Sequence, residues 1–137
     1  MNATLTRSAR GEINQLPCVF AVALKQRCAV CSLALHDTEK LLCTQPLARA
    51  NCASLHGVLR DKARFALGMR SEPLSRASTG DEMRLQCGGL QGLREQIDPE
   101  ALSVDVQRLL ERIQDGSLDT LAWEPLLRTI GLWSAGR

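Results

Sequence analysis

The sequence is poor in aromatic residues: it has two phenylalanines, two tryptophans and no tyrosine among 137 residues. Proteins that bind single-stranded nucleic acid without sequence preference stack successive bases on aromatic side chains. Four aromatic residues are too few for such a platform, so this class of protein is not expected. Hydrophobic residues nevertheless make up 45% of the chain, and the core is therefore expected to be aliphatic and rich in cysteine.

Long apolar runs are also missing. The longest, Leu16–Leu24, is about half of the roughly 20 residues that a membrane-spanning helix needs. It is also short for a secretory signal sequence, and it follows a polar segment. We therefore expect a cytosolic protein without a membrane segment. In that reducing compartment, the 6 cysteines indicate metal or redox chemistry before disulfide bonds.

The residues needed for a catalytic site are scarce. The chain has two histidines and no tyrosine, and no nucleophile, base and orienting group form a recognisable set. The segment GGLQG, residues 88–92, lacks the lysine and the spacing of a phosphate-binding loop. A binding or electron-transfer role is therefore expected in preference to catalysis.

Apolar periodicity predicts an all-α fold, a single domain formed by a small bundle of four to six helices around a cysteine-lined metal site. We expect a polar arm over residues 1–13, a cysteine-rich helical part over 14–69, a linker and ambiguous segment over 70–96, and a C-terminal helical pair over 97–137.

Local signals suggest the helix boundaries. One helix is expected from Pro17 to Leu35, and a short one over residues 38–43 behind the N-cap Asp37. A longer helix follows Pro46, a residue that suits the first helical turn, and extends to about Met69. In the C-terminal half, Asp98 and Pro99 predict the start of a helix that ends at Gly116, and a last helix covers residues 120–133.

The cysteines are concentrated in one part of the chain. Cys28 and Cys31 form a C-x2-C pair, and Cys43 and Cys52 follow it. Residues three apart on a helix have Cβ atoms about 5–6 Å from each other, which suits two ligands of one zinc ion or one iron–sulfur cluster. The sequence therefore predicts a metal site with Cys28, Cys31, Cys43 and Cys52 as ligands.

Two further cysteines are reserve ligands. In one continuous helix Cys18 lies about 15 Å from Cys28, too far for a shared cluster, whereas a break at KQR, residues 25–27, brings it closer. Cys87 precedes two glycines, whose backbone freedom allows it to approach the site.

Two other interpretations of the cysteines remain open. Cys28 and Cys31 share a helical face with Leu24 and Leu35, which is also the pattern of an ordinary core stripe. The C-x-x-C pair is also found in thiol–disulfide enzymes, but there it begins a helix after a strand, and no strand is expected here.

The spacing bears on which metal is bound. Structural zinc sites usually use two close cysteine pairs, and this chain has one. His36 and His56 have no ligand-type spacing to a partner. A [4Fe–4S] cluster is larger than a single ion and accepts more widely spread cysteines, so it is favoured, with zinc as the alternative.

Two surfaces are candidates for binding a partner. Arg49, Arg60 and Arg64 lie on one face of the helix after Pro46, and such a basic face docks an acidic redox partner or a phosphate backbone. It is also the pattern of a solvated helix face. Trp133 is hypothesised to lie at a partner or homo-oligomer interface, although it equally suits the core.

Together these features predict a small cysteine-ligated metalloprotein. It would act in electron transfer or in cluster-based sensing, as an accessory to a larger protein partner such as a redox enzyme. One alternative is a zinc-stabilised or metal-free helical adaptor that acts by binding a protein. Another is a regulator that binds nucleic acid through the basic N-terminal half of the chain.

Overall fold

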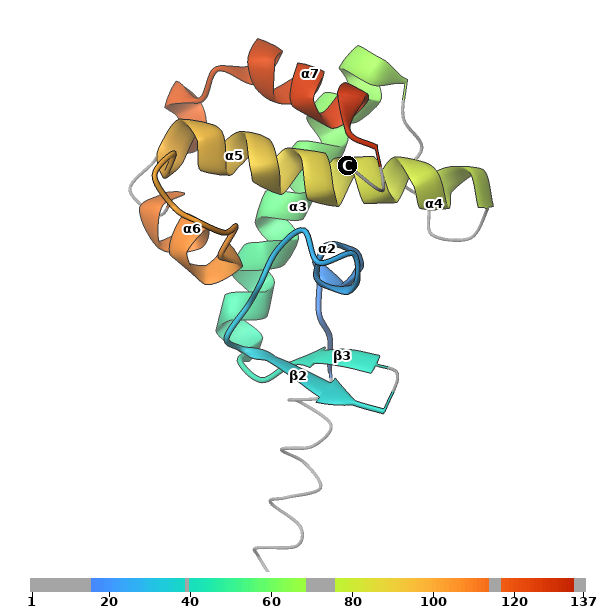
Figure 1. Cartoon of the computed structure of the whole chain (residues 1–137), viewed down its shortest axis with the longest axis vertical. Coiled ribbons are helices and arrows are strands. Elements are labelled where there is room, and N and C mark those ends of the chain that lie inside the picture. Colours follow the sequence, from blue (N-terminus) through green and yellow to red (C-terminus); the bar gives the residue numbers. More distant parts are fainter. Residues whose placement is uncertain (1–15, 39, 69–75, 114–116, 135–137) are drawn as a thin grey trace, which may run out of the picture.

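The computed structural model describes residues 16–38, 40–68, 76–113 and 117–134. Over these ranges the chain is mostly helical, with a small sheet at one end (Figure 1). The elements are β1 (Leu16–Pro17), α2 (Ala21–Lys25), β2 (Ala34–Asp37), β3 (Lys40–Cys43), α3 (Pro46–Leu67), α4 (Arg76–Met83), the π-helical turn η1 (Arg84–Gly88), α5 (Gly89–Ile97), α6 (Val106–Ile113), the 3-10 turn η2 (Ser117–Thr120) and α7 (Trp123–Leu132). The expected arm over residues 1–13 and the expected helix end at Gly116 lie outside the described residues.

The sheet corrects the all-α prediction. β3 is its central strand, and β1 and β2 pair with it in antiparallel orientation. The short helix predicted over residues 38–43 is therefore wrong, and Asp37 ends a strand instead of capping that helix. Leu41, Leu42 and Cys43 are all buried, and so short an apolar run has no periodicity that separates a strand from a helix.

The first helix is much shorter than predicted. α2 ends at Lys25, and Arg27 has a left-handed backbone with φ 61°, a conformation that no α-helix continues. The chain then runs to Val30, whose N–H donates to the carbonyl of Val104 at 2.8 Å and whose carbonyl accepts from the N–H of Val106 at 3.0 Å. The break at residues 25–27 thus separates Cys28 and Cys31 from α2.

Helix α3 is the longest element and connects the sheet to the helical end of the molecule (Figure 1). It begins as predicted, with Pro46 in its first turn, and ends where Gly68 adopts φ 64°. One stripe of this helix is buried, and it comprises Cys52, Leu55, Leu59 and Ala63. The sulfur of Cys52 therefore belongs to the same face that holds the core together.

The predicted linker and ambiguous segment is helical from residue 76 onward. α4, η1 and α5 follow one another as a single rod that crosses α3 (Figure 1). A Cβ atom at Gly88 would lie 2.7 Å from Cα of Ile130, and one at Gly92 would lie 3.1 Å from Cγ of Leu126. These glycines therefore allow α7 to pack against the backbone of this rod.

The C-terminal helices begin later than the sequence predicts. Asp98 and Pro99 precede an irregular segment, and α6 starts at Val106. Its N-cap is Asp105, whose Oδ1 accepts from the backbone N–H groups of Gln107 at 3.1 Å and Arg108 at 3.3 Å. α7 lies within the predicted last helix.

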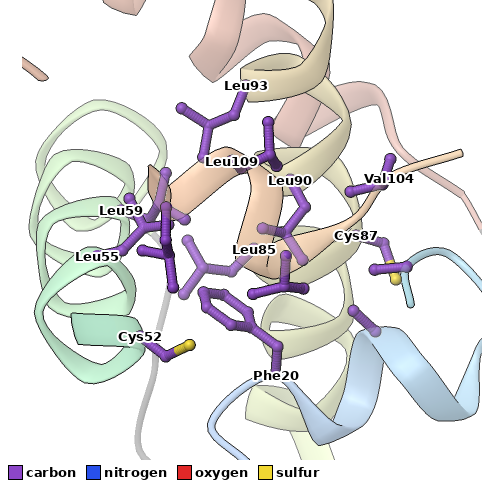
Figure 2. Close-up of a cluster of buried hydrophobic side chains, with 14 of the residues drawn as sticks. Phe20, Cys52, Leu55, Leu59, Leu85, Cys87, Leu90, Leu93, Val104 and Leu109 are labelled. Atoms are coloured by element: carbon purple, nitrogen blue, oxygen red, sulfur yellow. The ribbon is translucent and has the colours of Figure 1, made fainter. Parts of the chain in front are cut away.

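The core is built from aliphatic side chains and cysteine, with Phe20 as its one fully buried aromatic residue among those described (Figure 2). Leucine is its commonest residue, and most of these leucines belong to α3, η1, α5 and α6. Cys52 and Cys87 lie on opposite sides of this cluster in Figure 2. No helix among the described residues has both the length and the apolar character to cross a membrane.

Candidate functional site

Four cysteines from four different places in the chain lie near the junction of the sheet with α3. Cys18 follows β1, Cys31 precedes β2, Cys43 ends β3, and Cys52 lies in the second turn of α3. The charge of the Cys52 thiolate interacts with those of the other three. Cys18 in turn interacts with Cys31 and Cys43.

Strand pairing explains why three of these cysteines meet. The N–H of Cys18 donates to the carbonyl of Leu41 at 2.9 Å, which fixes the residue after β1 against β3. Ala34 at the start of β2 pairs with Cys43, and the N–H of Ala34 donates to the carbonyl of Cys31 at 3.2 Å. Cys18 therefore lies beside Leu41 of the central strand, and Cys31 lies just before Ala34, the residue that pairs with Cys43 on the other side.

Gln107 connects the cysteine cluster to α6. Its Nε2 lies 3.5 Å from Sγ of Cys31 and 3.9 Å from Sγ of Cys52. Because both sulfurs lie near this one nitrogen, the distance between the two sulfurs is at most the sum of the two nitrogen–sulfur distances. The pairing of Val30 with Asp105 holds the start of α6 beside this part of the chain.

The surroundings of two of these thiols, Cys52 and Cys18, raise the pKa and so favour the protonated form. Burial raises the pKa of Cys52 to about 12, and the negative charges of Cys31, Cys18 and Cys43 add to the effect, while the hydrogen bond from Gln107 opposes it. Burial also raises the pKa of Cys18, with smaller contributions from Cys31 and Cys43. Several thiolates therefore coexist here only if a positive group compensates their charge, as a bound metal does.

Cys28 lies with Cys87 and not with its C-x2-C partner. Burial raises the pKa of Cys87, and the neighbouring thiol of Cys28 adds to the effect. The segment that holds Cys28 and Cys31 is not helical. The structure therefore brings together three of the four predicted ligands, Cys31, Cys43 and Cys52. The fourth member of the group is Cys18, the reserve ligand that required a break at residues 25–27.

The spacing of the four thiols bears on the kind of metal. Among the described residues, no three His, Cys, Asp or Glu side chains are arranged to hold a single metal ion. Zinc binds thiolates at about 2.3 Å and therefore needs four sulfurs that nearly touch. An iron–sulfur cluster is larger, and its cysteine ligands stand farther apart. The described residues therefore show no metal site, and both the [4Fe–4S] cluster and the zinc alternative stay predictions.

The three arginines predicted to bind a partner differ in their surroundings. Arg49 is partly buried, and its Nε donates to the carbonyl of Pro17 at 2.7 Å, which ties β1 to α3. Its charge also lowers the pKa of Cys18. The side chain of Arg60 is 42% exposed and lies 3.5 Å from Asp61, and Arg64 is exposed. Docking of a partner on Arg60 and Arg64 stays a prediction.

The two tryptophans lie against the core without being enclosed by it. Trp123 packs on the core, and Nζ of Lys62 lies 5.2 Å from the centre of its ring. Trp133 follows α7, is partly buried, and packs close to Gly88. Its predicted role at an interface is not tested by these contacts.

A buried polar network was missed from the sequence. Nε2 of His56 lies 2.6 Å from Oε2 of Glu82, and the amide nitrogen of Gln86 donates to the same oxygen at 2.6 Å. The amide oxygen of Gln86 accepts from the N–H of Ala23 at 3.0 Å, and its nitrogen also donates to the carbonyl of Val19 at 3.2 Å. The network fastens α2 to η1, and no motif or periodicity in the sequence indicates it.

Comparison with known proteins yields no relative. No protein-family model, no curated protein and no solved structure matches this chain. The function is therefore argued from the chemistry of the described residues.

Proposed function

We propose that this protein binds one [4Fe–4S] cluster through Cys18, Cys31, Cys43 and Cys52 and transfers electrons to or from a larger redox partner. The observation that carries the proposal is that one amide nitrogen, Nε2 of Gln107, lies 3.5 Å from Sγ of Cys31 and 3.9 Å from Sγ of Cys52. Cys43 and Cys18 lie on and beside the strands next to them. When bound, such a cluster supplies one-electron chemistry. The proposed ligand set keeps three of the residues predicted from the sequence and takes Cys18 in place of Cys28.

The burial of the four cysteines supports an electron-transfer role. Cys43 and Cys52 are each 6% exposed, and they hold the inner side of the site. Cys18 and Cys31 are only partly buried, so the outer side lies near the surface where a partner docks. Exposure and hydrogen bonds to the sulfurs are the main means by which a protein sets the potential of such a site.

The chain's own residues prepare this site in two ways. Gln107 donates toward the sulfurs of Cys31 and Cys52 and thereby holds their side chains in orientation. The guanidinium of Arg49 places a positive charge near Cys18 and favours its thiolate form. Both effects lower the electrostatic free-energy cost of placing four thiolates in a partly buried site.

The test is metal analysis of anaerobically purified protein and of single cysteine variants. We expect iron and acid-labile sulfide in equal amounts, and an absorption in the visible range that bleaches and recovers on reduction and reoxidation. Cys18→Ser, Cys31→Ser, Cys43→Ser and Cys52→Ser should each lose most of the iron, because ligand binding and folding of such sites are coupled. Cys28→Ser and Cys87→Ser are the matched controls and should retain it.

Three results would contradict the proposal. Full iron content in Cys18→Ser would remove that residue from the ligand set, and loss of iron in Cys28→Ser would restore the set expected from the sequence. A colourless protein with one zinc per chain would instead support the zinc-stabilised adaptor.

A further inference from the structure

A pocket with two arginines lies beside the end of α2. It has a volume of about 330 Å³, and three segments line it: residues 27–30 after α2, residues 102–104 before α6, and Gln91 and Arg94 of α5. Arg27 and Arg94 are its charged residues, and none of the described residues that line it is acidic. Such a pocket attracts a negatively charged group, and its size suits a small molecule.

Hydrogen bonds hold the three walls of this pocket together. The N–H of Val30 donates to the carbonyl of Val104 at 2.8 Å, which joins the first two segments. Nη1 of Arg94 donates to the carbonyl of Ala101 at 2.9 Å, which joins α5 to the segment before α6. The pocket is therefore formed before any ligand arrives, and binding does not have to order the chain around it.

The backbone at Arg27 places an arginine where glycine is usual. The N–H of Arg27 donates to the carbonyl of Leu24 at 3.1 Å, and the N–H of Cys28 donates to that of Ala23 at 2.9 Å. These two bonds form the Schellman end of α2, whose left-handed position commonly holds glycine. Arg27 occupies it with φ 61°. Backbone strain of this kind is typical of functional sites, and the side chain that bears it lines the pocket.

Both guanidinium groups are available to a ligand. Among the described residues, neither Arg27 nor Arg94 is paired with a carboxylate. Arg94 uses only Nη1 in its hydrogen bonds to described residues, which go to the carbonyls of Ala101 and Pro99. The planar fork of a guanidinium matches the geometry of a carboxylate or a phosphate. Two such groups in one pocket therefore suit a single anionic head.

The same pocket offers apolar contacts. Val30 and Leu102 line it, and their side chains are 51% and 104% exposed. Val104, which is 8% exposed, also belongs to the lining. Single exposed apolar residues are ordinary, but these two lie in the same pocket as the two arginines. A ligand with an apolar body beside its charged head would cover them and gain free energy from their burial.

We propose that this pocket binds a small organic anion, with its carboxylate or phosphate head held by Arg27 and Arg94 and its apolar body against Val30 and Leu102. The site is independent of the proposed cluster, because none of the four clustered cysteines lines it.

The test is calorimetric titration of the full-length, anaerobically purified chain with phenyl phosphate and with benzoate. The two probes share an apolar ring and differ in the head, so the tighter one identifies the head as phosphate or carboxylate. Benzamide, the uncharged counterpart of benzoate, should not bind. Arg27→Gln should weaken binding of the tighter probe about tenfold, because it removes a charge-assisted hydrogen bond. Arg128→Gln makes the same change in net charge on the surface of α7, outside the pocket, and should leave the affinity unchanged.

A second variant tests the apolar part of the site. Because Leu102 is fully exposed, Leu102→Ser should leave the fold intact and weaken binding of the tighter probe several-fold. Four results would overturn the inference: no binding of either anion at millimolar concentration, an unchanged affinity in Arg27→Gln, equal weakening in Arg128→Gln, or benzamide binding as tightly as benzoate. Iron content measured in parallel separates failure of this site from failure of the cluster proposal, because the two readouts depend on different residues.

Discussion

Gln107 is the residue that links the proposed cluster site to the rest of the fold. One amide nitrogen contacts the sulfurs of Cys31 and Cys52, and the N-cap Asp105 fixes the start of the helix that carries it. Hydrogen bonds to cluster sulfurs stabilise the more negative, reduced state and so raise the reduction potential. A side chain that no ligand pattern reveals is therefore expected to control the redox behaviour of the site.

If the proposed cluster is bound, replacement of Gln107 by leucine should lower its reduction potential. A hydrogen bond to a charged group is worth about 1.5 kcal/mol, which corresponds to roughly 60 mV for a one-electron couple. Potentiometric titration of the visible absorption measures the shift. Gln91→Leu, on the exposed face of α5, is the control and should leave the potential unchanged. An unaltered potential in a Gln107→Leu variant with full iron would argue against the role of this amide.

Glu82 should make the stability of the fold depend on acidity. Burial raises the pKa of this carboxyl, but hydrogen bonds from His56 and Gln86 and the charges of His56 and Arg60 outweigh it, and the net pKa is lowered from 4.5. A lowered pKa in the folded state contributes stability that is present above pH 4.5 and is lost as the pH falls below it.

The variant Glu82→Gln isolates this contribution. It should lower the free energy of unfolding by on the order of 1 kcal/mol at pH 7, and the difference from wild type should shrink as the pH falls toward 3. Urea denaturation at several pH values measures it. If the free energies of unfolding of Glu82→Gln and wild type differ by the same amount at pH 7 and pH 3, Glu82 contributes through its packing and not through its charge.

At the scale of elements, the rod formed by α4, η1 and α5 owes its position to glycine. A Cβ atom at Gly88 would meet backbone atoms of α7, with Cα of Ile130 at 2.7 Å and the carbonyl oxygen of Thr129 at 3.0 Å. Backbone does not move aside as a flexible side chain does. The close approach of α7 to η1 therefore requires glycine at this position.

Gly88→Ala should destabilise the fold by about 1–3 kcal/mol, because α7 must shift away from the rod. Gly80 is the matched control: it lies inside α4, and an added Cβ would meet no atom within 4 Å. Gly80→Ala should raise stability by roughly 0.5–1 kcal/mol through the lower entropy of the unfolded chain. Chemical denaturation of both variants measures the contrast, and equal stabilities would contradict the packing explanation.

At the scale of the whole molecule, the helical core and the cysteine cluster are joined by α3. Leu55 and Leu59 of this helix belong to the leucine core, and Cys52 of the same buried stripe belongs to the cluster. The sheet is small and contributes only Leu41, Leu42 and Cys43 to the buried residues. The sheet end of the molecule is therefore expected to depend on the proposed cluster more than the helical end does.

Removal of the cluster should loosen the sheet end while most helical structure persists. Structural metal sites contribute folding free energy directly, and the leucine core does not involve the clustered cysteines other than Cys31 and Cys52. Hydrogen exchange of iron-loaded and iron-depleted protein should show lost protection in β2 and β3, with α5 and α7 little changed. Equal loss of protection in all elements would indicate one cooperative unit.

Local chemistry in the sequence determined several features of this protein. Pro46 marked the start of α3 because its missing N–H and restricted φ suit a first helical turn. The last helix followed from its dense apolar residues, and the scarcity of aromatics predicted an aliphatic core. Each of these inferences depends on residues that are close together in the chain.

Only the tertiary structure decided which cysteines meet. Cys28 and Cys31 are three residues apart, yet the break at Arg27 and the pairing of Val30 with Asp105 direct them to different neighbours. Cys18 joins the cluster because β1 pairs with β3, a contact between segments far apart in the sequence. The spacing of cysteines along the chain predicts which of them lie close together only when they belong to one regular helix or strand. Here strand pairing and helix packing set the positions of the sulfurs, and both depend on partners that no local pattern specifies.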